Sequence, residues 1–338
     1  MSVTPSVLFL TVAGAGAGLG HVKRCAALGS ALAGLGARVR FAVAGDAEPL
    51  GTMGVPLPGL EGLQWRGAMQ LALGDVERFR SDLVVVDAYG ATDDLLRALR
   101  TRAALVVAID DLSDRELPVD VVVNGAYHAE RRPYADVPGR LLLLGPRFVL
   151  LDPAFAELPR RAIRPAVSRV LVTLGGEDAG TALDAAVAAV ERALPMAAID
   201  VVAGPFAHAG FARGSRVETH RGLPSLRGLL LEADVAVTGA GMTLYECLAA
   251  GTPAVAVLVA ENQRPNCDAL AGEGLVLPGQ PDLSAAVERL AFDAPLRASM
   301  TERGRAMVDG RGAARVATEL LRAAAAMAPG STPARGPR

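Results

Sequence analysis

Short apolar runs rich in β-branched residues alternate along this chain with longer stretches in which apolar residues recur at helical spacing. Parallel α/β sheets produce this alternation, because each buried strand is followed by a helix that returns the chain to the start of the next strand. The first half predicts strands at residues 6–12, 38–44, 82–88, 104–110 and 120–125, with helices over 22–34 and 93–102.

The alternation stops in the middle of the chain and then restarts. Residues 141–155 are predicted to lead the chain out of the first domain, and 157–168, which combine prolines with charges, are predicted as a linker. The second half predicts strands at 169–176, 198–204, 234–239 and 253–259, with helices over 181–193, 243–249, 262–271, 283–291 and 313–326. We therefore predict two doubly wound Rossmann-like α/β domains that face each other across a cleft, residues 1–156 and 169–328, followed by a disordered tail at 329–338.

Composition narrows the class of protein. Hydrophobic residues make up 51% of the 338, which excludes a disordered chain, and 34 basic against 36 acidic residues argue against a nucleic-acid partner. Three scattered cysteines and four histidines show no metal-binding spacing, so we expect neither a metal nor a disulfide framework. The apolar segment at 7–18 lacks the basic residues of a signal peptide, and no run reaches the roughly 20 residues of a membrane span. We expect a cytoplasmic monomer with no cofactor and no membrane partner.

The first candidate site is the glycine-rich loop GAGAGLGH, which follows the first predicted strand. Its glycines, including Gly18 and Gly20, allow a ligand to approach the backbone, and the helix start after them favours negative charge. The GxGxxG spacing of a dinucleotide site fails, since Leu19 and His21 stand where the third glycine is needed. At a helix start the dipole disfavours imidazolium, so His21 is suited to act as a general base near pH 7. A helix-capping residue without chemistry is the alternative.

Two further glycine turns follow predicted strands of the second half. The turn TGAGMTLYE opens a helix near Thr243, and its free N–H groups with the Thr243 hydroxyl predict a phosphate cradle. Glu246, one helical turn further on, is placed to accept hydrogen bonds from ribose hydroxyls; a helix-capping carboxylate is the alternative. The turn TLGGEDAG contains Gly175 and Gly176 and ends the first strand of the second domain. Three glycine turns thus surround one predicted cleft.

Several short motifs occur in one order between about residues 6 and 320. They are Gly20-His21 with Arg24-Cys25, VVDAYG at 85–90, IDDLSDR at 109–115, LLGPRFVLL at 143–151, GAGMTLYE at 239–246, ENQ at 261–263 and DGRGAARV at 309–316. This combination resembles the UDP-sugar hydrolases of the pseudaminic-acid pathway, which are similar to spore-coat polysaccharide proteins and related to MurG-type glycosyltransferases. The resemblance implies a glycosyltransferase-B fold. It also implies a metal-free hydrolase that releases UDP, with inversion, from a UDP-2,4-diacetamido-2,4,6-trideoxyhexose.

The same resemblance implies roles for individual residues. His21 matches the family's catalytic histidine, and Tyr89 matches an active-site tyrosine. We expect contacts with the UDP-sugar from the glycine turns and their neighbours, namely Gly18, Gly20, Arg24, Gly175, Gly176, Gly239, Gly241, Met242, Thr243, Glu246, Asn262 and Gln263. Met242 departs from the family, in which we expect a serine, and its thioether supplies no hydroxyl near the phosphates.

The adjacent carboxylates Asp110 and Asp111 end a predicted strand at the same cleft edge. Adjacent side chains at a strand end point in different directions, so we expect one of them to cap a turn; a role in binding substrate or metal is the alternative. His128, His208 and His220 have no recognisable partners in the sequence and are predicted to lie on the surface.

Other functions use the same cleft. An inverting glycosyltransferase would use the same residues with an acceptor hydroxyl in place of water. For a MurG-like transferase with a lipid acceptor, the segment 53–65 is the candidate for a membrane-facing patch. A non-catalytic nucleotide-sugar sensor would not need His21. An NAD-dependent enzyme is disfavoured by the broken glycine motif, although Asp46 follows the second predicted strand.

Overall fold

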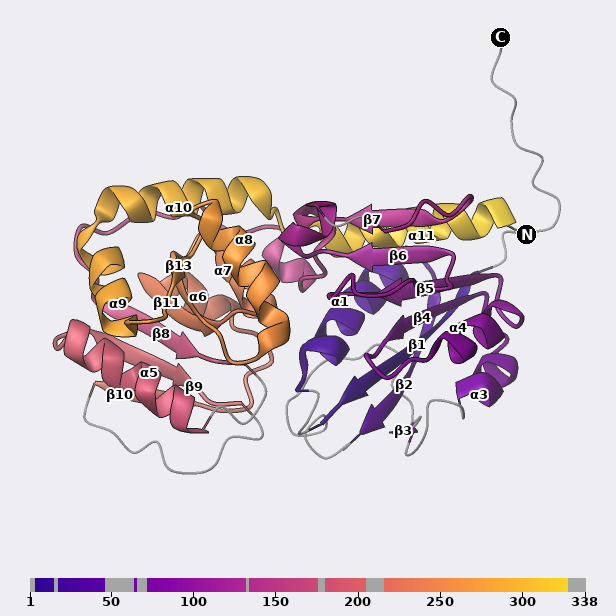
Figure 1. The fold of residues 1–338 in the computed structure, drawn as a ribbon, viewed down its shortest axis with the longest axis horizontal. Coiled ribbons are helices and arrows are strands. Elements are labelled where there is room, and N and C mark those ends of the chain that lie inside the picture. The colour runs from indigo at the N-terminus through magenta and orange to yellow at the C-terminus, as the bar shows by residue number, and fades with distance from the viewer. Residues whose placement is uncertain are drawn as a thin grey trace, which may run out of the picture.

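The computed structural model describes residues 4–14, 18–45, 64–65, 72–131, 134–175, 180–204 and 216–327. Its strands form two sheets, one in each half of the chain, and all neighbouring strands within them are parallel. Helices lie along both sheets (Figure 1). This architecture confirms the expected pair of doubly wound, Rossmann-like domains.

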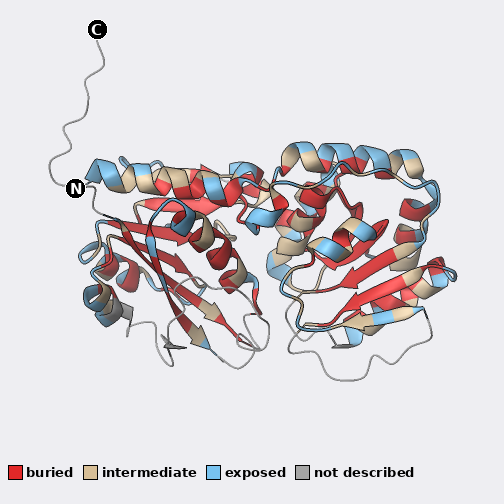
Figure 2. Ribbon diagram, turned by 180° about the vertical axis from the view of Figure 1, so that it is seen from behind, coloured by how far each residue is buried: buried red, intermediate tan, exposed pale blue. Residues whose placement is uncertain are grey.

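The first sheet has seven strands in the order β3-β2-β1-β4-β5-β6-β7. Their bounds are β1 (Ser6–Ala13), β2 (Arg38–Gly45), β3 (Gln64–Trp65), β4 (Leu83–Asp87), β5 (Leu105–Ile109), β6 (Val121–Asn124) and β7 (Leu141–Leu144). The central strands are buried almost throughout, as Figure 2 shows, because helices cover both faces of a parallel sheet. The strand order reverses between β1 and β4.

Two helices of the first half, α1 (Gly20–Gly34) and α4 (Asp93–Arg100), form close to the predicted ranges, whereas α3 (Ala72–Phe79) was not predicted. Short 3₁₀ turns lie at η2 (Tyr127–Arg131), η3 (Pro146–Phe148) and η4 (Pro153–Phe155). At the start of α4 the Thr92 hydroxyl caps the helix by accepting from the Leu95 N–H at 3.2 Å. The buried side chains Leu95, Leu96 and Leu99 form the apolar face of this helix.

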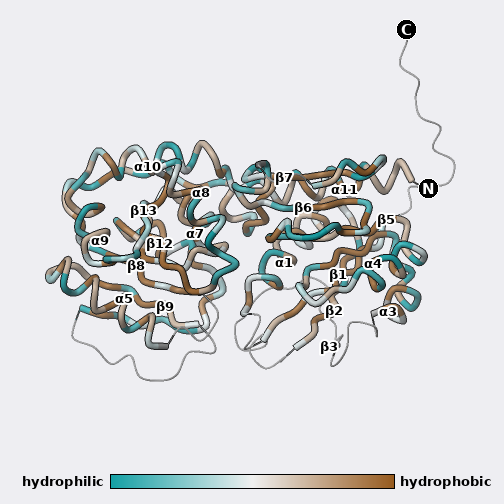
Figure 3. Tube along the Cα trace, in the orientation of Figure 1, coloured by the Kyte–Doolittle hydropathy of each residue, from teal (hydrophilic) through white to brown (hydrophobic). Residues whose placement is uncertain are grey.

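The second sheet has six strands in the order β10-β9-β8-β11-β12-β13, and the order reverses between β8 and β11. The strands are β8 (Arg169–Thr173), β9 (Ala198–Val202), β10 (Val217–His220), β11 (Val235–Gly239), β12 (Ala254–Val257) and β13 (Leu277–Pro278). The helices are α5 (Gly180–Ala193), α6 (Arg227–Glu232), α7 (Met242–Ala250), α8 (Arg264–Gly272), α9 (Leu283–Phe292) and α10 (Ala294–Met307), with the 3₁₀ turn η5 (Glu261–Gln263). Apolar residues are concentrated along the strands of both sheets (Figure 3).

The last helix corrects the predicted end of the second domain. The helix α11 (Gly312–Met327) forms where the pattern predicts, but it packs against α1 and the first sheet, with Val316 and Leu320 fully buried there. Figure 1 shows it lying along the first domain. The apolar stripe of this helix indicates that one face is buried, but it does not say against which sheet.

A second correction concerns the end of the first domain. The segment 141–144, predicted to lead the chain out of this domain, is instead the strand β7, which pairs with β6.

The two halves of the chain also meet through η2 and α7, where the Tyr127 N–H donates to the Tyr245 hydroxyl at 2.7 Å. That hydroxyl in turn donates to Asn266 Oδ1 on α8. None of the helices in the described part of the chain has the length and apolar character needed to cross a membrane.

Candidate active site

A cavity of about 540 Å³ lies where the loops from both strand-order reversals come together. Parallel sheets bind ligands at such points, because the loops after the two flanking strands diverge there. Its lining combines the start of α1 and the loops after β4 and β5 with the loops after β8, β11 and β12. The cavity therefore brings together loops that lie more than two hundred residues apart in the sequence.

The cavity collects nearly all of the predicted site residues. Lining it are Gly18, Gly20, His21, Arg24, Tyr89, Gly175, Gly239, Gly241, Met242, Thr243, Glu246, Asn262 and Gln263. Gly176 lies outside the described residues. Two of the glycines have backbone reasons for their identity: Gly18 has a φ of 62°, and a Cβ at Gly239 would lie 2.7 Å from the carbonyl oxygen of Leu174.

The first feature of the site is a buried pair formed by His21 and Asp87. Asp87 is the last residue of β4, and its Oδ1 lies 2.7 Å from Nδ1 of His21 on the first turn of α1. Both side chains are buried, Asp87 completely. An ionised carboxylate only accepts hydrogen bonds, so this contact places a proton on Nδ1 and leaves Nε2 as the nitrogen that can take up another.

Arg24 lies one helical turn after His21 and binds the same carboxylate. Its Nε and Nη2 donate to the two oxygens of Asp87 at 2.7 and 2.6 Å, and its Nη1 donates to Asp111 Oδ1 at 2.6 Å. Nη2 also lies 3.1 Å from His21 Nδ1. Each guanidinium nitrogen is thus engaged within the protein, which favours a positioning role over the substrate contact expected from the sequence.

The charges in this cluster determine the protonation of Asp87. Burial alone would raise the pKa of the Asp87 carboxyl, but the Arg24 guanidinium and the His21 ring together hold it well below its usual range. Asp87 is therefore ionised at neutral pH. The neighbouring Cys25 thiol, 3.4 Å from Asp87, has its pKa raised by burial and by the Asp87 charge, and so stays protonated.

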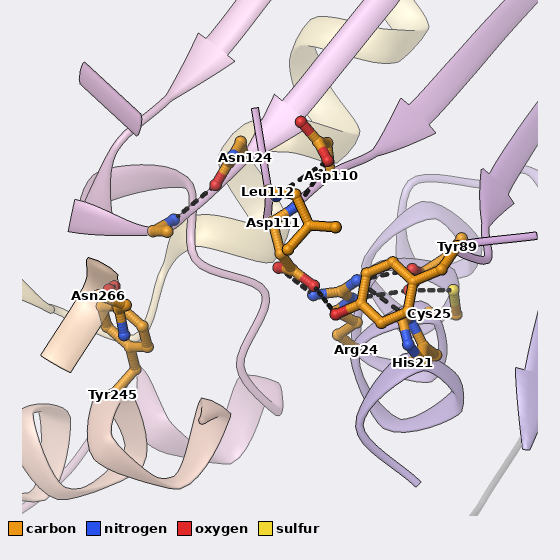
Figure 4. Close-up of polar contacts among 12 residues, drawn as sticks. His21, Arg24, Cys25, Tyr89, Asp110, Asp111, Leu112, Asn124, Tyr245 and Asn266 are labelled. Atoms are coloured by element: carbon orange, nitrogen blue, oxygen red, sulfur yellow. Dashed lines mark hydrogen bonds and ion pairs between the residues drawn. The ribbon is translucent and has the colours of Figure 1, made fainter. Parts of the chain in front are cut away.

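Tyr89 stands at the rim of the cavity, above His21. Its ring meets the His21 ring edge to face, with centroids 4.7 Å apart, and its hydroxyl donates to Asp111 Oδ2 at 2.9 Å (Figure 4). Burial, with the Asp111 charge adding to it, raises the pKa of Tyr89 above its ordinary value, so the phenol is a donor and not a base at neutral pH. About half of the side chain remains exposed to the cavity and solvent.

The adjacent carboxylates Asp110 and Asp111 take two different roles. Asp110 accepts from the backbone N–H groups of the next three residues, at 2.8, 3.1 and 3.0 Å, and from the Tyr134 hydroxyl at 2.6 Å. It is a turn cap, as expected for one member of the pair. Asp111 turns the other way and joins Arg24 to Tyr89.

The opposite wall of the cavity is the start of α7. Gly241 precedes the helix without any side-chain cap, so the first N–H groups of α7 are directed at the cavity. The Met242 side chain is partly buried against the core of the second domain. The side chain at position 242 thus supplies no donor on this wall, which leaves the backbone N–H groups at the start of α7. A helix start of this kind favours an anion such as a phosphate.

Glu246 lies one turn inside α7 and also lines the cavity. Burial raises its pKa; the Lys23 charge and a hydrogen bond from the Thr243 hydroxyl act in the opposite direction, while Asp152 adds to the increase. Thr243 also lines the cavity, so the phosphate contact expected of its hydroxyl stays a prediction. The carboxylate keeps lone pairs for further donors, as ribose binding requires.

Gln263 provides an acceptor of a different kind. Its Oε1 is buried and has no hydrogen-bond partner among the described residues, and its amide nitrogen lies beside Gly241. A buried acceptor of this kind is satisfied by a ligand hydroxyl or by water. Asn262, its neighbour, is exposed at the edge of the cavity.

Two histidines differ from their predicted surface position. His128 is buried in the cavity lining, with Nε2 3.2 Å from the Asp111 carbonyl oxygen. His220 is half-buried and lies 2.8 Å from Asp200 Oδ1. His208 lies outside the described residues. The partners of His128 and His220 come from other strands or loops, so the local sequence does not reveal them.

His220 belongs to a group of possible metal ligands, together with Asp200 and Glu218. The Asp200 oxygens already accept from Arg169 at 2.6 and 2.8 Å. That guanidinium neutralises the carboxylate, so a cation would have to displace it.

Sequence analysis assigned no role in the site to Asp87, and it assigned Asp111 only a place at the cleft edge. A signal for Asp87 was present, because an ionisable residue directly follows the apolar run 83–86, two residues before Tyr89. Arg24 stands three residues after His21, which places both on one face of the helix. What the sequence did not reveal is that this face meets the end of β4.

Comparisons with known proteins agree with this architecture. No protein-family model matches the chain. The spore coat polysaccharide biosynthesis protein SpsG of Bacillus subtilis (strain 168) is 27% identical over 270 residues, covering 74% of this chain and 79% of SpsG. The calicheamicin glycosyltransferase CalG4 has a TM-score of 0.63 at 20% identity, covering 96% of this chain and 100% of CalG4. The structure of S. aureus MnaA with UDP gives a TM-score of 0.66 at 12% identity, covering 94% and 96%.

The chain is therefore a homologue of SpsG with the fold of glycosyltransferase-B enzymes. The similarity to SpsG confirms the spore-coat branch of the resemblance found in the motifs. The match to CalG4 confirms the expected glycosyltransferase-B fold. The pseudaminic-acid branch stays a prediction.

Proposed function

We propose that this protein binds a UDP-sugar in the cavity between its two sheets and transfers the sugar, with inversion at the anomeric carbon, to a hydroxyl acceptor. The observation that carries the proposal is the buried His21–Asp87 pair, in which His21 lines the same cavity as the uncapped start of α7. A base on one side and an anion site on the other are the two parts that such a reaction needs. The fold shared with CalG4, a glycosyltransferase, and with MnaA, which has been solved with UDP, supports the same conclusion.

His21 acts as the general base. With Nδ1–H donated to Asp87, its Nε2 takes the proton of the acceptor hydroxyl as the acceptor oxygen forms a bond to the anomeric carbon. Asp87 stabilises the imidazolium that results, and Arg24 keeps Asp87 ionised and in place. The Tyr89 ring covers His21 and contacts the sugar.

The second domain stabilises the leaving group. As the bond between the anomeric carbon and the phosphate oxygen breaks, its electron pair goes to UDP. The N–H groups at the start of α7 then stabilise the added charge. Glu246 holds the ribose hydroxyls, and Asn262 and Gln263 contact the sugar, where the unpartnered Gln263 Oε1 accepts from a sugar hydroxyl.

Hydrolysis is the second candidate, because the motif order resembles hydrolases of the pseudaminic-acid pathway. Water then takes the place of the acceptor hydroxyl, and every residue keeps its role. The substrate would be a UDP-2,4-diacetamido-2,4,6-trideoxyhexose, and the free sugar would serve nonulosonic acid synthesis.

One assay separates the two reactions. Purified protein is mixed with this UDP-sugar, or with UDP-N-acetylglucosamine as a comparison, and UDP release is followed with and without a panel of hydroxyl acceptors. Transfer predicts UDP release that rises with an acceptor, whereas hydrolysis predicts full release without one. Proton NMR of the product at early times reports inversion in either case. Absence of both UDP binding and UDP release with all donors would contradict the proposed function.

A further inference from the structure

Two lysine or arginine side chains line the described part of the cavity, Lys23 and Arg24. Arg24 is bound by Asp87 and Asp111, so its charge is already compensated. Lys23 lies between His21 and Arg24 in sequence and is half-buried, and its ammonium group forms no hydrogen bond or ion pair with any described residue. It is also the single lysine of the chain. The described part of the cavity therefore holds one cation whose ammonium group is not engaged in an ion pair with a described residue.

The fold places Lys23 opposite the start of α7. The turn η4 packs against both α1, which carries Lys23, and α7, which carries Glu246. The two helices belong to different domains, and their first turns line one cavity. The Lys23 charge acts on Glu246 and opposes the effect of burial on that carboxyl, which agrees with an ammonium directed across the cavity.

The other charged groups near Lys23 are acidic, so little else in the cavity would neutralise the charge of a bound diphosphate. Glu246 on α7, Asp152 at the start of η4 and Asp111 after β5 are all acidic and all line the cavity. A diphosphate brings further negative charge, and the start of α7 supplies only about half a positive charge. The Met242 side chain offers no hydrogen-bond donor. An ammonium ion is a compact point charge that suits phosphate oxygens.

We propose that Lys23 binds the phosphates of the nucleotide from the first domain, opposite the N–H groups of α7. This proposal rests on the proposed function, since it names a further residue of the same nucleotide site. Lys23 then connects the first domain to a ligand held mainly by the second. Its ammonium group stabilises the phosphate charge, to which the hydroxyl of a serine at position 242 would otherwise donate.

The test is a calorimetric series with uridine, UMP and UDP. The proteins are the wild type, Lys23→Met, Lys23→Arg and Arg322→Met, in which the last removes one charge from an exposed residue of α11. For Lys23→Met we expect about 10- to 100-fold weaker UDP binding, a smaller loss for UMP and unchanged uridine binding, the range for a hydrogen bond to a charged group. Lys23→Arg should keep most of the UDP affinity, and Arg322→Met should match the wild type. UDP binding by the wild type should also weaken more with added salt than binding by Lys23→Met.

Three results would overturn the proposal in distinguishable ways. Unchanged UDP affinity in Lys23→Met would show that Lys23 does not contact phosphate. An equal loss for uridine and UDP would show that Lys23 acts through Glu246 and the ribose, and not on the phosphates. A wild type that binds no UDP would refute the proposed function itself, and this inference with it. Thermal unfolding of each variant checks that the fold is intact.

Discussion

Replacing Asp87 by asparagine tests the centre of the site with the smallest change in shape. The carboxylate accepts from His21 Nδ1, from two nitrogens of Arg24 and from the Cys25 thiol. An asparagine offers one acceptor oxygen, and its amide nitrogen is a donor that must face one of these donors. The variant therefore leaves buried donors unpaired and removes the charge that balances Arg24.

The expected effects can be worked out from these contacts. Removing one partner of a buried ion pair costs about 3–5 kcal/mol. Arg24 keeps its bond to Asp111, so we expect the lower part of that range. His21 loses the acceptor that fixes its Nδ1 proton, so we expect the rate to fall by about 10²–10⁴, the contribution of a positioned general base.

Urea unfolding and steady-state UDP release, both at 25 °C, measure the two effects separately. Asp234→Asn is the matched control, because Asp234 is also a buried carboxylate and accepts from Ser168, Arg169 and Arg164. It precedes β11, whereas the cavity lies at the other end of that strand. The control should lose stability and keep its rate per folded molecule. Equal rates for Asp87→Asn and the wild type would refute the role of Asp87.

The pH dependence of stability gives a second readout of the same variant. Because the folded-state pKa of Asp87 lies below the unfolded value of about 3.9, its stabilisation is complete above that value and is lost as the pH falls toward the folded-state pKa. The difference in unfolding free energy between the wild type and Asp87→Asn should thus be constant from about pH 5 to 7 and shrink below about pH 4. A difference that does not change down to pH 3 would contradict the ionised state of Asp87.

Three further predictions follow from the same geometry. His21→Asn should lower kcat by about 10²–10⁴ while UDP affinity stays near that of the wild type and stability falls by only about 1 kcal/mol; near-full kcat would make the histidine structural. Glu246→Ala should weaken UDP binding by about 1–3 kcal/mol in calorimetry, and an unchanged affinity would leave Glu246 with its Thr243 contact alone. UDP release should persist in EDTA, because the start of α7 and Lys23 supply the charge stabilisation; loss of release that a divalent ion restores would refute this.

Local patterns predicted most of the strands and helices because burial in a parallel sheet leaves a strong apolar signal. The strand β10 (Val217–His220) escaped prediction, since it is partly exposed and contains Glu218, Thr219 and His220. The helix α10 was also missed, because Arg297 is buried there by bonds to backbone carbonyls and not by apolar character. A pattern of apolar residues does not reveal such a buried cation.

The sequence predicted which loops line the site, but not the hydrogen bonds and ion pairs that join their side chains. Glycine turns and motif order selected the cavity lining, including His21 and Glu246. The contacts that give His21 its chemistry cross 63 to 87 residues of sequence, from α1 to Asp87 and Asp111. Such partners follow from the strand order, which places β4 beside β1, and that order is a property of the whole sheet.

A structure of the protein with UDP bound tests the central claim most directly. The account predicts the phosphates within about 2.7–3.2 Å of the N–H groups of Met242 and Thr243, the ribose at Glu246, and the terminal phosphate facing His21 across the cavity. UDP bound with its phosphates on the glycine loop before α1, or outside this cavity, would contradict it.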